Sequence, residues 1–178
     1  MEAITYRKLT LETFDPNALD GFVRRQQVTR CWRQQGDTLV LRDVCYTEDW
    51  SLNRRREAAA EVRELLAQGG AAYGALLDGT VIGFATLSPE RSGSRGQYLE
   101  LQMFQVSAPF RGRGIGRELF RLVSGEAKAR GAGSLYISAH SAFESIAAYR
   151  RLGCIPAREI NPVLAAAEPY DLQLECPL

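Results

Sequence analysis

A glycine-rich stretch, RGRGIG at residues 111–116, carries the clearest chemical signal in the sequence. It follows the strand-like run LELQMFQV and opens an amphipathic pattern that is typical of a helix. Free backbone N–H groups at a helix start, together with the helix dipole, attract an anion, and a phosphate group fits such a site best. Glycine lets an oxygen approach the backbone closely, and two arginines add positive charge. The stretch therefore predicts a loop that binds phosphate.

Three phosphate-binding patterns compete for this loop. A P-loop would continue with Lys and Ser or Thr after Gly116, whereas this chain continues with Arg and Glu. A dinucleotide fingerprint would have Gly or Ala in place of that arginine and an acidic residue about 20 positions further on, and residues 131–140 contain none. The third pattern, Arg/Gln-x-x-Gly-x-Gly/Ala, is the pyrophosphate loop of acetyl-CoA-dependent transferases and is matched by Arg111, Gly114 and Gly116. A surface turn that merely starts a helix is the remaining alternative.

Over roughly residues 71–153 the chain resembles the GNAT superfamily of N-acetyltransferases. Val106 stands five residues before the loop's first arginine, as a valine does in that family. The family ending Tyr-x-x-x-Gly-Phe is matched from Tyr149, with Cys154 in place of Phe. The resemblance implies a mixed α/β fold, in which a splayed pair of parallel strands is flanked by helices. It also implies acetyl-CoA as the co-substrate, with no metal.

The same resemblance assigns the parts of the cofactor to residues. The splayed strands would be residues 98–106 and 134–139, whose unpaired backbone would bind pantetheine, and the amide of Val106 would face the oxyanion. The family often has Asn where Ala142 stands, and Ser141 or Ser145 are the candidates to replace it. The predicted cofactor-binding residues are Phe104, Val106, Arg111, Gly112, Arg113, Gly114, Ile115, Gly116 and Ser145.

Acetyl transfer to an amine requires a group that removes the proton of the amine. Glu100 lies six residues before Val106, and strand alternation places both on one face with Gln102 and Phe104. We expect that face to look at the substrate, and some GNAT enzymes carry a base glutamate at this spacing. A solvated or structural carboxylate is an equal alternative. His140, the single histidine, and water are the other candidate bases, although a capping or surface role is favoured for the histidine.

The leaving thiolate also requires a proton, and Tyr149 is the predicted donor. A phenol has a pKa of about 10, which is close to that of a thiol. In the GNAT family the tyrosine of this motif points at the thioester sulfur. The alternative is an aromatic ring packed in the core.

Aromatic and acidic residues of the N-terminal part are candidates for the acceptor pocket. Trp32, Tyr46 and Trp50 could line it, and core packing is the alternative for each. Glu48 and Asp49 could attract a cationic amine, and a solvated acidic pair is the alternative. The expected partner is the amine of a small molecule or peptide.

Composition limits the other functions. The 178 residues include 22 Lys and Arg against 21 Asp and Glu, and the net charge of +1 gives no general attraction to nucleic acid or membrane. The four cysteines form no C-x-x-C pair, which disfavours a metal site. The absence of a secretory signal favours the cytoplasm. A homodimer is an expectation from the class alone.

Alternation, helical periodicity and turn residues predict the elements that position these side chains. A meander followed by strand–helix–strand–helix–strand predicts a mixed sheet with helices on its faces. No linker divides the chain, so one domain is expected over residues 1–178, with the cofactor-binding core at about 71–153. Strands are expected at residues 4–9, 28–33, 38–44, 71–77, 80–87, 98–106, 134–139, 154–160 and 170–176, and helices at residues 14–27, 51–70, 115–131 and 141–153.

The leading hypothesis is therefore an N-acetyltransferase that moves an acetyl group from acetyl-CoA to a primary amine by direct attack in a ternary complex. A CoA-binding or regulatory module without catalysis is the alternative from another class, and the presence of Glu100 and Tyr149 disfavours it. An arginine-rich nucleic-acid binder is disfavoured by the balanced charge.

Overall fold

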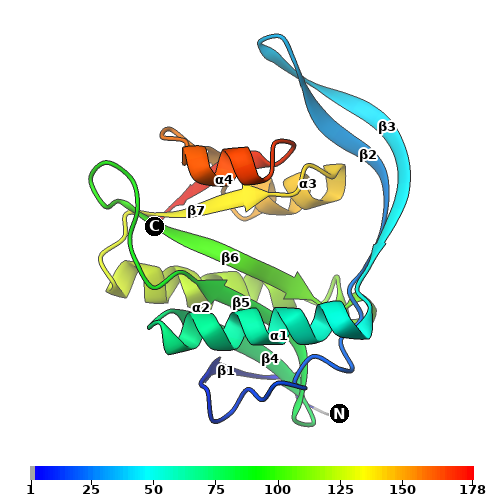
Figure 1. Cartoon of the computed structure of the whole chain (residues 1–178), viewed down its shortest axis with the longest axis vertical. Helices are drawn as coiled ribbons and strands as arrows, with labels where there is room; N and C mark the ends of the chain where they lie inside the picture. The colour runs from blue at the N-terminus through cyan, green and yellow to red at the C-terminus, as the bar shows by residue number, and fades with distance from the viewer. Residues whose placement is uncertain (1–2) are drawn as a thin grey trace.

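A computed structural model describes residues 3–178 of the chain as two sheets and four α-helices (Figure 1). The strands are β1 (Thr5–Leu9), β2 (Arg25–Gln35), β3 (Thr38–Asp49), β4 (Ala71–Leu77), β5 (Thr80–Leu87), β6 (Tyr98–Val106), β7 (Ser134–Ala139), β8 (Ile155–Pro156) and β9 (Leu172–Pro177). The helices are α1 (Leu52–Ala67), α2 (Ile115–Ala129), α3 (Phe143–Arg151) and α4 (Pro162–Ala167), and a 3-10 turn covers Ala108–Phe110. Within residues 3–178, no helix is long and apolar enough to cross a membrane.

The larger sheet has seven strands in the order β1-β4-β5-β6-β7-β9-β8. Every neighbouring pair is antiparallel except β6 and β7, which are parallel. Helix α1 lies in front of this sheet and α2 lies behind it (Figure 1). Their apolar stripes are buried in two separate clusters, one on each face. The mixed sheet with helices on its faces, predicted from the order of elements, is confirmed.

Local signals account for the elements around the centre of the sheet. Ser51 caps α1, because its hydroxyl accepts a hydrogen bond from the backbone N–H of Arg54 at 3.2 Å. The β4–β5 turn consists of Asp78 and Gly79, whose φ angles of 48° and 79° fit the tight hairpin turns that match strand twist. The predicted strands at residues 71–77, 80–87, 98–106 and 134–139 have the observed bounds.

The parallel strands β6 and β7 separate along their length. They pair only over residues 98–100 and 134–136. Beyond this point β6 remains paired with β5 as far as Val106, and β7 remains paired with β9 as far as Ala139. The expected splay is therefore present, and it opens towards the carboxyl ends of both strands.

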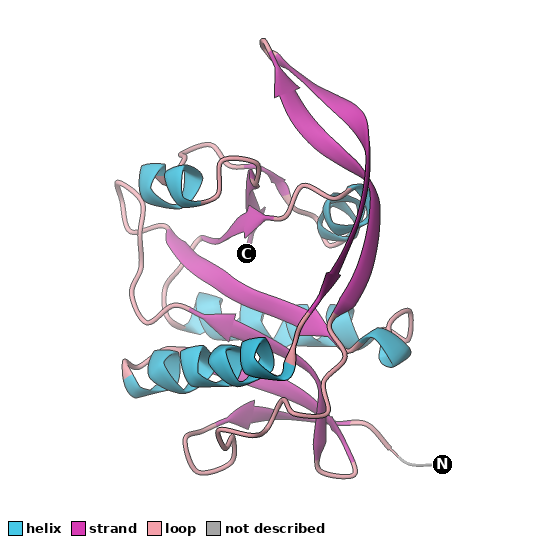
Figure 2. Cartoon of the chain, turned by 45° about the vertical axis from the view of Figure 1, so that its right-hand side comes forward, coloured by secondary structure: helices cyan, strands magenta, loops and turns pink. Residues whose placement is uncertain are grey.

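Strands β2 and β3 form a separate two-stranded sheet. Figure 2 shows them rising from the body as a long twisted ribbon. The sequence predicted this hairpin at residues 28–33 and 38–44; the observed β2 is longer at both ends, and β3 is longer at its carboxyl end. An isolated pairing of Cys31 with Ala142 fixes β2 against the start of α3.

The helix predicted at residues 14–27 is wrong. The chain there makes successive turns with i to i+3 hydrogen bonds, and β2 already begins at Arg25. Gly21 weakens helix formation, and the chain must turn to bury Phe14 and Phe22 completely in the core under α1. Burial of these two rings therefore overrides the local helical pattern.

The C-terminal part differs from the prediction in a second place. The strand expected at residues 154–160 is reduced to the two residues of β8. The unpredicted helix α4 follows, with Asn161 as its N-cap and proline at its first position. The strand expected at 170–176 is confirmed as β9, shifted by one or two residues.

Candidate active site

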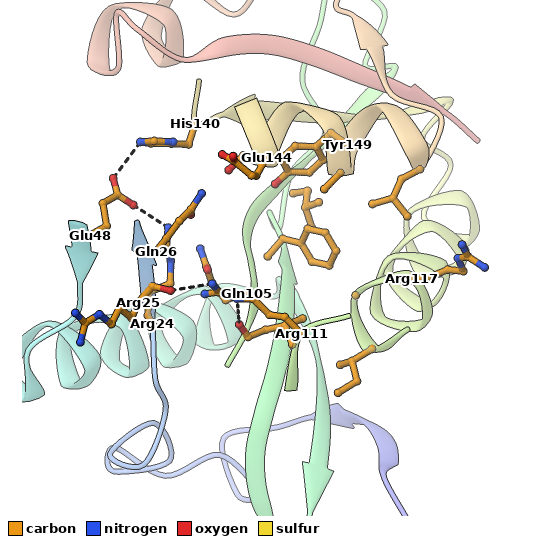
Figure 3. Close-up of a pocket in the computed structure, with 18 of the residues that line it drawn as sticks. Arg24, Arg25, Gln26, Glu48, Gln105, Arg111, Arg117, His140, Glu144 and Tyr149 are labelled. Carbon is orange, nitrogen blue, oxygen red and sulfur yellow. Dashed lines mark hydrogen bonds and ion pairs between the residues drawn. The ribbon is translucent and has the colours of Figure 1, made fainter. Parts of the chain in front are cut away.

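A cavity of about 1340 Å³ lies where β6 and β7 separate (Figure 3). One end is the glycine-rich loop at the start of α2, and α3 forms a wall. The other end is formed by β2, the last part of β3 and the segment between α4 and β9. The cavity thus joins the predicted phosphate loop to residues that are distant in the sequence.

The start of α2 presents its backbone to this cavity. Gly112 and Gly114 have φ angles of 76° and 82°, which favour glycine. Gly114 is the N-cap residue and supplies no side-chain hydrogen bond to the helix. Because the first N–H groups of a helix have no partner within the helix, the backbone at Ile115 and Gly116 can donate to an anion here.

The side chains of the loop are used differently from the expectation. Arg111 donates from Nε to the carbonyl of Val106 at 3.0 Å and from Nη1 to the carbonyl of Arg25 at 2.8 Å, so it ties β6 to β2. Arg113 does not line the cavity, and its guanidinium lies 5.4 Å from the ring centre of Phe110. Arg117, one helical turn along, lines the cavity and was missed by the sequence reasoning.

Ile115 also has a limited role at the loop. Its side chain is 1% exposed and is buried in the core behind the sheet. Only its backbone can therefore contact a ligand. Gly116 has room for a small side chain, because a Cβ placed there would lie 3.4 Å from Phe104 and 3.8 Å from Val106.

The bottom of the cavity is aromatic. The Phe104 ring centre lies 5.8 Å from that of Phe120 on α2 and 6.0 Å from that of Tyr149 on α3. Tyr149 lines the cavity, and its burial, helped by the charges of Cys154 and Asp171, raises its pKa. The phenol therefore keeps its proton throughout the neutral range.

The prediction that Glu100, Gln102, Phe104 and Val106 share one face is wrong. The pairing register of β6 shifts, because Thr86 lies opposite Met103 while Leu87 lies opposite Leu101. The extra residue is a β-bulge, and it moves the positions that pack on the α2 side of the sheet from Leu99 and Leu101 to Phe104 and Val106.

As a result, Glu100 lies on the opposite face from Phe104 and does not line the cavity, although its neighbour Gln102 does. Burial raises the pKa of Glu100, and a hydrogen bond from Gln102 partly offsets this effect. Its predicted role as the base stays a prediction.

The start of α3 decides between the two serine candidates. Ala142, at the position of the family asparagine, is completely buried beneath β2. The hydroxyl of Ser141 accepts a hydrogen bond from Arg33 at 2.7 Å. Ser145 lines the cavity from the first turn of α3. It is therefore the better placed of the two hydroxyls to meet a ligand.

The end of the cavity opposite the loop holds carboxylates among arginines, because Arg24, Arg25 and Arg54 line the cavity beside Glu48, Glu168 and Asp171. Glu48 is held there by two side chains, at 3.0 Å from Nε2 of His140 and 2.8 Å from Nη2 of Arg24 (Figure 3). The hydrogen bond with His140 is the main cause that lowers the pKa of Glu48, while burial opposes it. Asp49 is exposed and lies outside the cavity. The acidic residues that line the cavity are Glu48, Glu144, Glu168 and Asp171.

Hydrogen bonds to both ring nitrogens fix the orientation of His140. The backbone N–H of Ala142 donates to Nδ1 at 3.2 Å. Nε2 faces Glu48 and also lies 3.2 Å from the hydroxyl of Tyr46. This geometry assigns the hydrogen of the neutral ring to Nε2, because Nδ1 must accept. The acceptor nitrogen is thus already occupied, which favours a positioning role over that of a base.

The three N-terminal aromatic residues do not line the cavity. Trp50 packs under α1, where its ring centre is 6.3 Å from that of Phe22. Trp32 packs against the core, with Arg150 above its ring. Tyr46 reaches the site only through His140. The two tryptophans therefore pack against the core, which was the alternative interpretation for them.

Asp171 is the functional candidate that sequence reasoning missed. It directly precedes β9, and its carboxylate accepts a hydrogen bond from Ser138 on β7 at 3.0 Å. An acidic residue at the start of a predicted strand is a weak signal of a functional role. Only the pairing of β9 with β7 places Asp171 at the cavity. Within residues 3–178, no group of three or more His, Cys, Asp or Glu side chains is arranged to hold a metal ion.

Comparison with known proteins establishes the class. A model of the Acetyltransferase (GNAT) family matches residues 37–154, which is more than half of the chain. The chain therefore belongs to the GNAT acetyltransferase family, and the resemblance seen in its motifs is confirmed. A search of curated proteins finds no significant match.

Solved structures share the fold over almost the whole chain. Nourseothricin acetyltransferase has a TM-score of 0.73 at 22% identity, and the match covers 98% of each chain. A candidate streptothricin acetyltransferase from Bacillus anthracis str. Ames, in complex with acetyl coenzyme A, has a TM-score of 0.68 at 16% identity, with 99% of this chain and 98% of that chain covered. The PaiA N-acetyltransferase of Thermoplasma acidophilum, in complex with coenzyme A, has a TM-score of 0.60 at 15% identity, with 99% of each chain covered.

Proposed function

We propose that the protein is an acetyl-CoA-dependent N-acetyltransferase that acetylates a primary amine of a small cationic molecule by direct attack in a ternary complex. The observation that carries the proposal is the course of the cavity. It runs from the free start of α2, past the splayed strands, to an end that holds the carboxylates of Glu168 and Asp171. A cofactor with a pyrophosphate at one end and a reactive thioester at the other fits this course.

The loop end supports the cofactor. The backbone N–H groups of residues 114–116 would bind the pyrophosphate, and Arg117 would add charge beside it. The unpaired edges of β6 and β7 offer backbone groups to the pantetheine arm, and Ser145 offers a hydroxyl. The acetyl-CoA and CoA complexes of the structural neighbours support the same assignment.

The reaction requires a proton donor for the leaving thiolate, and Tyr149 is proposed for that role. Its hydroxyl is protonated at neutral pH because burial raises its pKa. Its ring is fixed against Phe104 at the bottom of the cavity. Direct attack by the amine then needs no covalent enzyme intermediate, since both substrates have a place in the same cavity.

Carboxylates at the end of the cavity opposite the loop support a cationic acceptor. Arg24, Arg25 and Arg54 also line the cavity, and Arg24 is paired with Glu48. Glu168 and Asp171 have no ion-pair partner within residues 3–178, and Asp171 lies close enough to Glu168 and Glu48 for their charges to affect its pKa. Carboxylates that share a cavity attract an ammonium group and repel an anion. A molecule with more than one amine would leave one cation among the carboxylates while another amine reacts.

A panel of amines tests the proposal. Thiol release from acetyl-CoA would be followed with diamines, polyamines, nourseothricin, streptothricin, free amino acids and short peptides. We expect kcat/KM to be at least about tenfold higher for acceptors with a second cationic group than for acceptors with a carboxylate. Binding of acetyl-CoA without turnover of any amine would instead indicate a CoA-binding module, and a preference for anionic amines would refute the acceptor class.

A further inference from the structure

The position of Asp171 is set by strand pairing. Leu172, the first residue of β9, lies opposite Ala139, the last residue of β7. Asp171 therefore lies beside the carboxyl end of β7, where β6 has already moved away. This is the part of the cavity where the splayed strands would place a thioester.

One oxygen of the Asp171 carboxylate is fixed and the other is free. Oδ2 accepts from the Ser138 hydroxyl at 3.0 Å, and that hydroxyl accepts from Nε2 of Gln173 at 2.9 Å. Gln173 in turn accepts from the hydroxyl of Tyr136 at 2.6 Å. Within residues 3–178, Ser138 is the one side chain that hydrogen-bonds the carboxylate. Oδ1 can therefore accept from a substrate without breaking this network.

Charged groups from several parts of the chain lie around Asp171. Burial is the main cause that raises its pKa, and the negative charges of Glu168 and of Glu48 on β3 add to it. The hydrogen bond from Ser138 and the charge of His140 act in the opposite direction. On α3, the charge of Asp171 contributes to the raised pKa of Tyr149.

Resting on the proposed N-acetyltransferase function, we infer that Asp171 is the general base, which binds the acceptor ammonium through Oδ1 and removes its proton before attack. The amine nitrogen then forms a bond to the thioester carbon, and the carbonyl electron pair moves to the oxygen. When the intermediate collapses, the C–S bond breaks and the thiolate takes the Tyr149 proton. The second proton of the amine restores the phenol, directly or through water, and Asp171 releases its proton to solvent.

The other carboxylates are less suited to this step. Glu48 is paired with Arg24 and His140, which lower its pKa and make it a weaker base. Glu100 lies across the β-bulge, on the face away from Phe104, and does not line the cavity. Of these three carboxylates, Asp171 is the one that lines the cavity, has an oxygen without a hydrogen bond within residues 3–178 and lies in an environment that strengthens its basicity. Groups whose environments push their pKa values apart take different roles.

The pH profile of Asp171→Asn tests the inference. Without the base, the reaction depends on the fraction of acceptor that is already uncharged, and this fraction rises with pH. We expect kcat/KM for a reactive diamine to fall by about 10²–10⁴-fold at pH 7, and by much less at pH 9 to 10. Asp43→Asn, at an exposed site on β3 outside the cavity, is the matched control and should keep the wild-type profile. A loss for Asp171→Asn that is equal at every pH, or no loss, would overturn the inference.

Ser138→Ala provides a second route if Asp171→Asn does not fold. Removal of the hydroxyl withdraws a hydrogen bond that lowers the pKa of Asp171, so the acid limb of the kcat/KM profile should move to higher pH. An unmoved acid limb contradicts the inference. Calorimetric titration with acetyl-CoA shows whether each variant keeps its cofactor site, and turnover then separates the role of Asp171 from the proposed function. Failure of the wild type to turn over any amine refutes the proposed function, whereas wild-type turnover with an unchanged variant profile refutes only the role of Asp171.

Discussion

Replacement of Tyr149 by phenylalanine removes one hydroxyl and leaves the packing of the ring. The contact with Phe104, at 6.0 Å between ring centres, is retained in Tyr149→Phe. In the described part of the chain the hydroxyl has no side-chain hydrogen bond, so the free energy of unfolding should change by less than about 0.5 kcal/mol. The cofactor loop is untouched, and acetyl-CoA affinity should therefore be retained.

The expected loss in kcat follows from the environment of the phenol. A positioned acid contributes about 10²–10⁴-fold to a rate. Because burial raises the pKa of Tyr149 further above that of a thiol, proton transfer to the thiolate is uphill, which favours the lower end of that range. We expect kcat to fall by about 10²-fold, which corresponds to about 2.7 kcal/mol in the barrier.

Thiol release at saturating acetyl-CoA and acceptor measures this loss, with single-turnover mixing to exclude limitation by product release. Tyr73→Phe is the matched control, because its hydroxyl bonds Glu126 at 2.9 Å, away from the cavity. That variant should lose about 1 kcal/mol of stability and keep its kcat. If kcat of Tyr149→Phe stays within about twofold of the wild type, Tyr149 is a packing residue and water protonates the thiolate.

Two further predictions concern charged groups. Burial would raise the pKa of Glu126, but hydrogen bonds from Lys8, Tyr73 and Arg130 lower it to about 2, so its stabilisation is complete above about pH 5 and is lost as the pH falls towards 2. Glu126→Gln should therefore lower the free energy of unfolding by about 1–2 kcal/mol at pH 7, after allowance for solvent screening. Thermal unfolding at pH 3 should show a much smaller difference between the variant and the wild type. A stability difference that does not depend on pH would contradict this prediction. Glu48→Gln should raise KM for a cationic acceptor by about tenfold and leave acetyl-CoA affinity unchanged. The control is D49N, a substitution at the exposed neighbouring residue, which should change neither quantity. Equal KM values for Glu48→Gln and the wild type in steady-state kinetics would remove Glu48 from the acceptor site.

The parts of the fold that local chemistry determines could be predicted from the sequence. The Asp78-Gly79 turn defines the β4–β5 hairpin, and the apolar periodicity after Gly114 defines α2. The helix expected at residues 14–27 failed because burial of Phe14 and Phe22 depends on α1, which is distant in the sequence. Local propensity cannot report such a tertiary preference.

The candidate site shows the same division. The loop residues and Tyr149 follow a motif, and all of them except Arg113 line one cavity. The face of Glu100 was predicted wrongly because a β-bulge depends on the register with β5, which periodicity along a single strand does not reveal. Asp171 was missed because only the pairing of β9 with β7 brings it to the splayed strands.

Calorimetric titration with acetyl-CoA tests the central claim, that this cavity is the cofactor site, most directly. Gly116→Asp suits the test, because φ at this position is not in the left-handed region, a Cβ fits at 3.4 Å from Phe104, and an acid in the first turn of α2 favours the helix. Gly125→Asp, at an exposed and unobstructed site on the same helix, is the control. We expect binding by the wild type and Gly125→Asp, and a Kd at least about tenfold higher for a folded Gly116→Asp, because the new carboxylate repels the pyrophosphate. Equal affinity in all three proteins would contradict the assignment of this cavity as the cofactor site.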